Sequence, residues 1–184
     1  MKMPNYIINH NYLDDNIILH AILESTQYNF WFVIKNMIID YIINSAKNFG
    51  INDIAVVSGY KKNVLKKYLK ESHFTFYSND EYDSTNMVTS LFAAKEYMDD
   101  DLIISYSDIV YSENVILKLL NSNFDNAIII DVDWYKLWKK RFKNPLDDAE
   151  TLIFDSCNNL LDIGRKTKDY NNIMGQYIGL MKFN

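Results

Sequence analysis

Residues 101–132 read DLIISYSDIVYSENVILKLLNSNFDNAIIIDV, and this stretch decides the fold. Its two ends carry the short apolar runs LIISYS and AIIIDV, which predict strands. Between them Ser112 opens a segment in which Ile116 and Leu120 recur at helical spacing, so the middle of the stretch predicts a helix. A strand, a helix and a strand in this order are typical of a right-handed βαβ unit with parallel strands.

The same alternation continues on both sides of this stretch. The other elements that the pattern predicts are, in chain order, a helix over 34–49 that stops at Gly50, a strand over 53–58, a helix over 64–69, a strand over 73–77, a helix over 85–98, a short helix over 134–142, a hairpin of 151–154 with 160–163, and a strand over 176–183. The sequence therefore predicts an α/β fold, with a Rossmann-like, mostly parallel sheet and helices on both faces.

The first 33 residues do not follow this pattern. Short apolar runs at 17–23 and 31–33 are compatible with two buried strands. The chain has only five glycines, none of which precedes Gly50, whereas average usage would give roughly a dozen. This excludes a glycine-rich phosphate loop from the first quarter of the chain. We therefore expect a single domain made of an atypical N-terminal segment, 1–33, and an α/β domain, 34–184.

Charge and composition exclude several classes of function. The chain of 184 residues has a formal net charge of -5, which argues against a nucleic-acid partner. No apolar run approaches the ~18 residues of a membrane helix, so we expect no membrane span. Cys157 is the single cysteine, which excludes an internal disulfide and suits a reducing compartment. A cytoplasmic location is the expectation.

Asp108 is the clearest candidate for chemistry. It follows the predicted strand DLIISYS, and ligands of parallel sheets sit beyond the carboxyl ends of the strands. A carboxylate at that place can hold Mg²⁺ against a triphosphate. The alternative is an aspartate that caps the following turn. The residues alone leave both interpretations open.

Aromatic side chains form a second candidate. Trp134 and Trp138 are four residues apart, so on a helix they share a face, and Asp133 beside them adds negative charge. Two indoles on one face pack in a core or form part of a cage for a quaternary ammonium, because the ring quadrupole attracts a cation. The acidic group Asp147, Asp148 and Glu150 is interpreted as solvated charge.

Several segments together resemble a known family. They are GINDIAVVSGYKKNVLKKYL, FTFYSNDEYDSTNMVTSLFAAKEYM, DLIISYSDIVY, DVDWYKLWKKRFKNPLDDAETL, IGRK and GQYIGLMKF, in that order. This arrangement resembles the nucleotidyltransferase superfamily of sugar-nucleotide pyrophosphorylases. Within it, the choline-phosphate and phosphonate cytidylyltransferase branch fits best. The resemblance covers about residues 34–183, and its specific part is W-x3-W-x2-R with the trailing D-D-A-E-T.

The resemblance implies a fold of the nucleotide-diphospho-sugar transferase type. It implies Mg²⁺-dependent transfer of a nucleotidyl group from a nucleoside triphosphate, CTP being favoured, to a phosphorylated alcohol such as phosphocholine, with release of pyrophosphate. It also implies roles for single residues. Asp108 would be an Mg²⁺ ligand; Thr85, Asn86 and Ser90 would lie near the nucleotide; Trp134, Trp138, Gln176 and Tyr177 would lie on the side of the phosphorylated substrate.

Three departures from the family pattern keep alternatives open. Residues 1–33 hold no G-x-G-x-R type loop, a later metal-binding Asp is not found, and Gln176 stands where such enzymes often carry Glu. One alternative is therefore a catalytically inactive, truncated or degenerate family member that acts as a binding module. Another is a nucleotidyltransferase for a sugar 1-phosphate. The sequence leaves the base, the acceptor, the pathway and homo-oligomerisation open.

Overall fold

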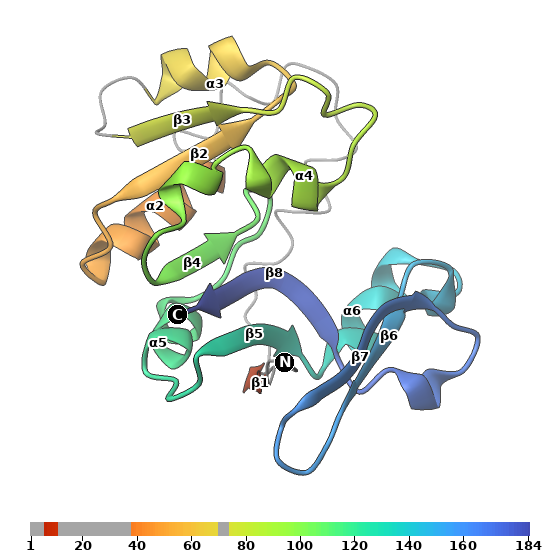
Figure 1. Cartoon of the computed structure of the whole chain (residues 1–184). Helices are drawn as coiled ribbons and strands as arrows, with labels where there is room; N and C mark the ends of the chain where they lie inside the picture. The colour runs from red at the N-terminus through yellow and green to blue at the C-terminus, as the bar shows by residue number, and fades with distance from the viewer. Residues whose placement is uncertain (1–5, 11–37, 70–73) are drawn as a thin grey trace. The chain divides into compact units, whose positions relative to one another are not determined.

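The computed structural model describes residues 6–10, 38–69 and 74–184 (Figure 1). It divides into two compact units. The first unit takes the chain up to Ser45 together with 103–184, and the second takes 46–102. Helix α2 (Ile38–Asn48) runs across this division.

The first unit is built on a four-stranded sheet. Its strands lie in the order β1 (Tyr6–His10), β5 (Asn126–Asp131), β8 (Gln176–Phe183) and β4 (Leu102–Ser105). β1 pairs with β5 in parallel, while β8 pairs with β5 in the antiparallel sense. This part of the sheet is therefore mixed, because β5 has a parallel neighbour on one side and an antiparallel one on the other. The chain enters β8 after a helix and a hairpin.

Helix α5 (Glu113–Leu120) connects β4 to β5 and covers one face of the sheet. Side chains alternate between the two faces of a strand, so Ala127 and Ile129 of β5 turn toward this helix. They form a fully buried cluster with Val115, Leu119 and Leu180, each between 0 and 2% exposed. The amphipathic pattern of 113–120 is what places Val115 and Leu119 in this cluster.

The opposite face of β5 packs against a hairpin. Strands β6 (Glu150–Phe154) and β7 (Leu160–Lys166) pair in the antiparallel sense. Ile130 and Leu152 are the buried centre of this second cluster, and the half-buried residues around them are Ile128, Val132, Phe154, Leu160 and Tyr177. Helix α6 (Trp134–Arg141) and the 3₁₀ turns Pro145–Asp147 and Tyr170–Asn172 complete the unit.

The second unit is built on a two-stranded parallel sheet of β2 (Ile54–Ser58) and β3 (Phe74–Ser78). Helix α3 (Lys62–Tyr68) follows β2, and α4 (Met87–Phe92) follows β3, with a 3₁₀ turn at Lys95–Tyr97. The buried apolar residues of this unit are Val56, Leu69 and Ala94.

The predicted α/β class and nearly every predicted element are confirmed. The helix expected over 85–98 is shorter, because Asn86 caps α4 with its side chain and Lys95–Tyr97 forms a separate 3₁₀ turn. The second strand of the hairpin extends further than expected, to Lys166. The expected strands at 17–23 and 31–33 lie outside the described residues. None of the helices within the described ranges is long and apolar enough to cross a bilayer.

Leu180 tests the packing of α5 on the sheet. Leu180→Ala should lower the free energy of unfolding by about 2–5 kcal/mol, because it opens a cavity in a fully buried cluster. Leu161→Ala is the matched control, since Leu161 is 63% exposed, and its effect should stay within about 0.5 kcal/mol. Urea denaturation measures both. Equal losses for the two variants would contradict the assignment of the core.

Candidate functional site

Asp108 lies in an exposed turn directly after β4. The strand is tied to β8 at this point, where the backbone N–H of Tyr106 donates to the carbonyl of Gly179 at 2.8 Å. The Tyr106 side chain is half-buried, and burial raises the pKa of its hydroxyl. The carboxylates of Asp108 and Glu150 raise this pKa further, so negative charge gathers on this side of Tyr106.

Tyr177 packs against Tyr106. The two rings meet edge to face, with centroids 5.8 Å apart and planes at 82°. Burial raises the pKa of the Tyr177 hydroxyl above its ordinary value, and the neighbouring Tyr106 adds to this rise. The hydroxyls of Tyr177 and Tyr106 interact with each other, and this contact contributes to the pKa shifts of both groups. Tyr177, which the family resemblance assigns to the substrate, therefore lies in the same cluster as the predicted metal ligand.

The two predicted tryptophans share a face of α6, as their spacing requires, but their surroundings differ. Trp134 is 5% exposed and packs with Ala149 and Ile173 in a buried cluster. Its ring meets that of Trp138 at 6.0 Å and stacks at 24° on Tyr170. Trp134 therefore packs in a core, which is the first of the two interpretations given for this pair of indoles.

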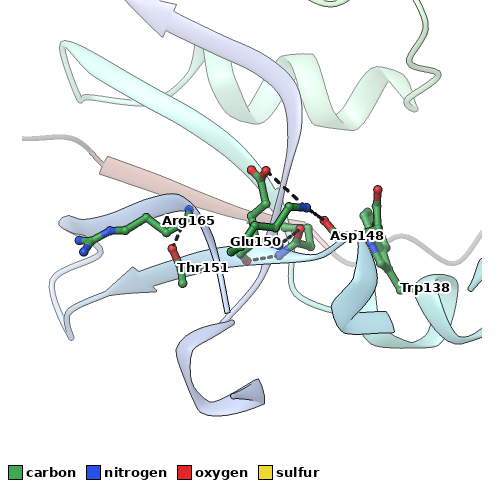
Figure 2. Close-up of polar contacts among 7 residues, drawn as sticks. Trp138, Asp148, Glu150, Thr151 and Arg165 are labelled. Carbon is green, nitrogen blue, oxygen red and sulfur yellow. Dashed lines mark hydrogen bonds and ion pairs between the residues drawn. The ribbon is translucent and has the colours of Figure 1, made fainter. Parts of the chain in front are cut away.

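Trp138 is half-buried and makes a polar contact. Its indole Nε1 donates to Oδ2 of Asp148 at 2.9 Å (Figure 2). The Arg141 guanidinium lies over the Trp138 ring, 5.8 Å from the centroid. Asp148 is exposed, which agrees with its interpretation as solvated charge, and its carboxylate also accepts this hydrogen bond. The specific motifs W-x3-W-x2-R and D-D-A-E-T therefore meet in one contact.

The segment from Asp148 to Thr151 is held from several sides (Figure 2). Lys166 on β7 donates to the carbonyl of Asp148 at 3.1 Å, and its Nζ lies 4.0 Å from Oε1 of Glu150. The hydroxyl of Thr151 accepts a hydrogen bond from the backbone N–H of Arg165 at 3.1 Å. The Glu150 carboxylate itself stays half exposed. A partly solvated carboxylate thus projects from a well-fixed backbone.

Gln176 fixes that backbone. Its Nε2 donates to the carbonyls of Glu150 at 2.7 Å and Gly175 at 2.9 Å, and its Oε1 accepts from the N–H of Glu150 at 3.3 Å. The side chain is 7% exposed. The predicted substrate residue therefore joins the start of β6 to the start of β8 in this structure, and its amide is occupied by the backbone.

The three residues expected near the nucleotide lie in the second unit around Asn79. The Asn79 side chain is buried, and its Nδ2 donates to the hydroxyls of Thr85 at 2.8 Å and Ser90 at 2.9 Å. Its Oδ1 accepts from the N–H of Glu81 at 3.1 Å. Asn86 caps α4 by accepting from the N–H of Thr89 at 3.1 Å.

Asn79 and Tyr106 were not predicted from the sequence. Asn79 stands in the polar run SNDEYDSTN, where no periodicity marks one residue as buried. Tyr106 continues the alternation of its strand and looks like any core aromatic. The only signal available was position, because Asn79 lies two residues beyond a predicted strand and Tyr106 lies at the carboxyl end of another.

Asp131 is a further buried carboxylate, at the end of β5. It is 4% exposed, and its Oδ1 accepts from the N–H of Asp133 at 2.8 Å, just before α6 begins. Burial raises its pKa from an ordinary value of 3.8 to about 6. The sequence analysis singled out Asp133, whose carboxylate instead pairs with Lys136 at the surface.

Asp108 is suited to one kind of metal ion. Within the described ranges no group of three or more His, Cys, Asp or Glu side chains gathers as a preformed metal cage. Mg²⁺ does not need one, because it is usually held by one or two carboxylates together with water and substrate phosphates. The exposed Asp108 fits that mode of binding. The magnesium assignment stays a prediction.

Comparison with known proteins identifies the class of protein. No family model matches the chain. The CTP:phosphoglutamine cytidylyltransferase of Campylobacter jejuni is 48% identical over 153 residues, which cover 79% of this chain and 60% of that protein. The bifunctional protein GlmU of Thermosipho melanesiensis is 30% identical over 107 residues, covering 54% of this chain and 23% of GlmU.

A solved structure agrees in fold. The inositol-1-phosphate CTP transferase from T. maritima superposes with a TM-score of 0.62 at 15% identity, over 99% of this chain and 71% of that one. These relatives support membership of the nucleotidyltransferase superfamily, with cytidylyltransferases among the relatives, in agreement with the resemblance at the level of the superfamily. The choline-phosphate branch stays a prediction. The chain spans about 60% of the length of the Campylobacter cytidylyltransferase and less of GlmU.

Asp131 predicts a specific pH dependence of stability. Its folded pKa of about 6 lies above its ordinary value, so between these values the folded state holds a proton that the unfolded state has lost. This contribution is complete below pH 4 and disappears as the pH rises through 6. Asp131→Asn keeps the acceptor for Asp133 and removes the effect.

Urea unfolding of the wild type and of Asp131→Asn at pH 4.5 and 7.5 measures this difference. The advantage of the variant in free energy of unfolding should grow by about 1–2 kcal/mol between the two pH values. All other titratable groups are the same in the two proteins, so their contribution to the pH dependence cancels in the difference between wild type and variant. The same difference at both pH values would contradict the raised pKa.

Proposed function

We propose that this chain transfers a cytidylyl group from CTP to a phosphorylated small molecule and releases pyrophosphate. One observation carries the proposal: Asp108 follows a strand end beside the half-buried pair Tyr106 and Tyr177, and the charges of Asp108 and Glu150 both act on the Tyr106 hydroxyl. The relative that is 48% identical is a cytidylyltransferase by name, which supports CTP as the donor.

The reaction requires little of the protein beyond binding and orientation. An oxygen of the acceptor phosphate attacks the α-phosphorus of CTP, a new P–O bond forms, and the bond from the α-phosphorus to the β-phosphate oxygen breaks. The electron pair and charge of that bond leave with pyrophosphate. A bound Mg²⁺ supplies charge neutralisation on the triphosphate oxygens. Asp108 is the residue that would hold it.

The nucleotide is assigned to the second unit. Asn79 fixes Thr85 and Ser90 through two hydrogen bonds, so their hydroxyls need no reordering when a ligand arrives. Asn86 orders the start of α4 next to them. Thr85, Asn86 and Ser90 remain the residues that we propose to contact or shape the nucleotide site.

The surroundings of Tyr106 favour an acceptor that carries nitrogen. With Asp108 assigned to the metal, the half-exposed Glu150 carboxylate is the charge that acts on the Tyr106 hydroxyl, and the Tyr106 ring meets that of Tyr177 edge to face. Negative charge next to aromatic rings attracts ammonium groups and N–H donors. Phosphocholine and a phosphorylated glutamine, the substrate in the name of the Campylobacter relative, both have such groups, whereas a sugar 1-phosphate does not.

A nucleotide-binding module without turnover is the second candidate. The amide of Gln176 is fully engaged with backbone groups, at the position where related enzymes often carry a carboxylate. This side chain therefore supplies no metal ligand. Such a protein would bind CTP and leave it intact, and the assay below separates the two cases.

Pyrophosphate release tests the proposed reaction. The chain is incubated with CTP and Mg²⁺ and with phosphocholine, phosphorylated glutamine or glucose 1-phosphate as the acceptor. Asp108→Ala should lower the rate at least 100-fold, because one preorganised charge-stabilising group is worth about that much. Asp99→Asn, at an exposed bend, is the control and should keep the wild-type rate.

The outcomes of this assay are distinct. No release above the level of Asp108→Ala with any acceptor rejects the enzymatic function. CTP binding by calorimetry without release then supports the binding module. Release with glucose 1-phosphate alone would overturn the assignment of a nitrogen-bearing acceptor.

Indole fluorescence tests the acceptor side directly. Phosphocholine should change the tryptophan emission of the wild type at concentrations where glucose 1-phosphate does not, because a cation near an indole alters its emission. Trp138→Phe should remove most of this response, since Trp138 is more exposed than the buried Trp134. An unchanged response in Trp138→Phe would show that this indole does not report on the acceptor.

A further inference from the structure

Tyr106 sits at an unusual place in the sheet. Opposite Ile128 and Ile130 of β5, strand β8 is irregular: Ile128 pairs with Met181 and Ile130 pairs with Tyr177. A step of two residues along β5 therefore corresponds to a step of four along β8, so β8 carries extra residues here and forms a bulge. Gly179 lies in this bulge with φ +88° and accepts the hydrogen bond from the Tyr106 backbone. Bulges re-aim side chains and strand ends near functional sites.

Gly179 leaves room for the Tyr106 ring. A Cβ added to Gly179 would lie 2.6 Å from Cδ2 and 2.7 Å from Cγ of that ring, closer than real Cβ contacts allow. The ring therefore rests on the bare Cα of Gly179, and it also meets the ring of Tyr177 edge to face. Any side chain at position 179 would displace the ring.

The turn that carries Asp108 starts immediately after this ring. Ser105 adds a further tie, because its hydroxyl donates to the Tyr106 carbonyl at 3.0 Å. Beyond Tyr106 the residues Ser107 and Asp108 form an exposed turn. The turn is thus anchored on both sides: on the β4 side by the half-buried Tyr106, and after Asp108 by Ile109, which packs against the cluster under α5. Tyr106 is the anchor on the side of the strand.

We propose that Tyr106, seated on Gly179, is the positioning residue for Asp108. The ring holds the end of β4 in place, and the bulge in β8 provides the space in which the ring packs. This assigns a physical purpose to the G-x-Y-x-G pattern at 175–179: its tyrosine packs against Tyr106 and its second glycine makes the seat. The functional consequence, weaker metal–nucleotide binding when the seat is lost, rests on the proposed function.

A spin label measures the order of the turn without any ligand. The label is attached to Ser107→Cys in a Cys157→Ser background, since Cys157 is exposed and is the single native cysteine. Tyr106→Ala and Gly179→Ala should each shorten the rotational correlation time of the label at least twofold. Tyr106→Phe keeps the seated ring and should leave the label within experimental error of the parent.

Gly50→Ala is the matched control for Gly179→Ala. Gly50 has a similar φ of +81°, but nothing lies within 4 Å of an added Cβ. It therefore carries the same backbone penalty without the contact. The double variant Gly179→Ala with Tyr106→Ala should unfold at a higher urea midpoint than Gly179→Ala alone, because the clash is relieved, while the label stays mobile.

Binding of Mn²⁺ in the presence of CTP, read from the free Mn²⁺ resonance, gives the functional arm. Tyr106→Ala and Gly179→Ala should weaken it at least tenfold, and the control Gly50→Ala by less than twofold. A label that stays ordered in Tyr106→Ala, or a Tyr106→Phe as mobile as Tyr106→Ala, overturns the positioning role. A wild type that binds no Mn²⁺ with CTP counts against the proposed function, and the label still decides whether Tyr106 holds the turn.

Discussion

The first unit depends on the burial of β5 on both faces. Ala127 and Ile129 pack under α5, while Ile128 and Ile130 pack toward the hairpin. A strand that is apolar on both faces is not held in register by hydrophobic alternation, because a slip of one residue exchanges one apolar set for another. Other contacts must fix its register.

Glycine and polar contacts at the end of β5 provide this restraint. A Cβ at Gly175 would come within 2.9 Å of Cδ1 of Ile130. The backbone just before β8 can therefore lie this close to Ile130 only because residue 175 has no side chain. Beside it Gln176, which pairs with Asp131 across the strands, holds β6 through two hydrogen bonds to the backbone of Glu150. The same end of the sheet that carries the candidate site is thus the end where the register is fixed.

The order of elements could be predicted because each strand and helix is short, apolar and bounded by a clear break. The runs LIIS and AIIID can be recognised as strands from the local sequence alone, and they form β4 and β5 as predicted. The antiparallel entry of β8 and its bulge could not be predicted in this way. They arise from contacts such as the one between Gly179 and Tyr106, which lie far apart in the sequence.

The candidate site was predicted in part for the same reason. Asp108 was found because strand ends are recognisable, and the shared face of Trp134 and Trp138 followed from helical spacing. Which of the two indoles is buried depends on Ala149 and Ile173, and no local pattern contains that information. The hydrogen bond from Trp138 to Asp148 is likewise a tertiary contact that no local pattern predicts.

The hydrogen bonds of Asn79 also determine where hydroxyl protons point. Its Oδ1 accepts from the N–H of Glu81, so its Nδ2 must be the donor to both hydroxyls. Thr85 receives one of these bonds and donates its own proton to the Glu81 carbonyl at 2.7 Å, so its donor is already used. Ser90 accepts from the same amide, and its own proton is not used in any of the described hydrogen bonds of this group. The two hydroxyls are therefore of opposite polarity toward a ligand, and Ser90 is the one that presents a donor to a phosphate or carbonyl oxygen.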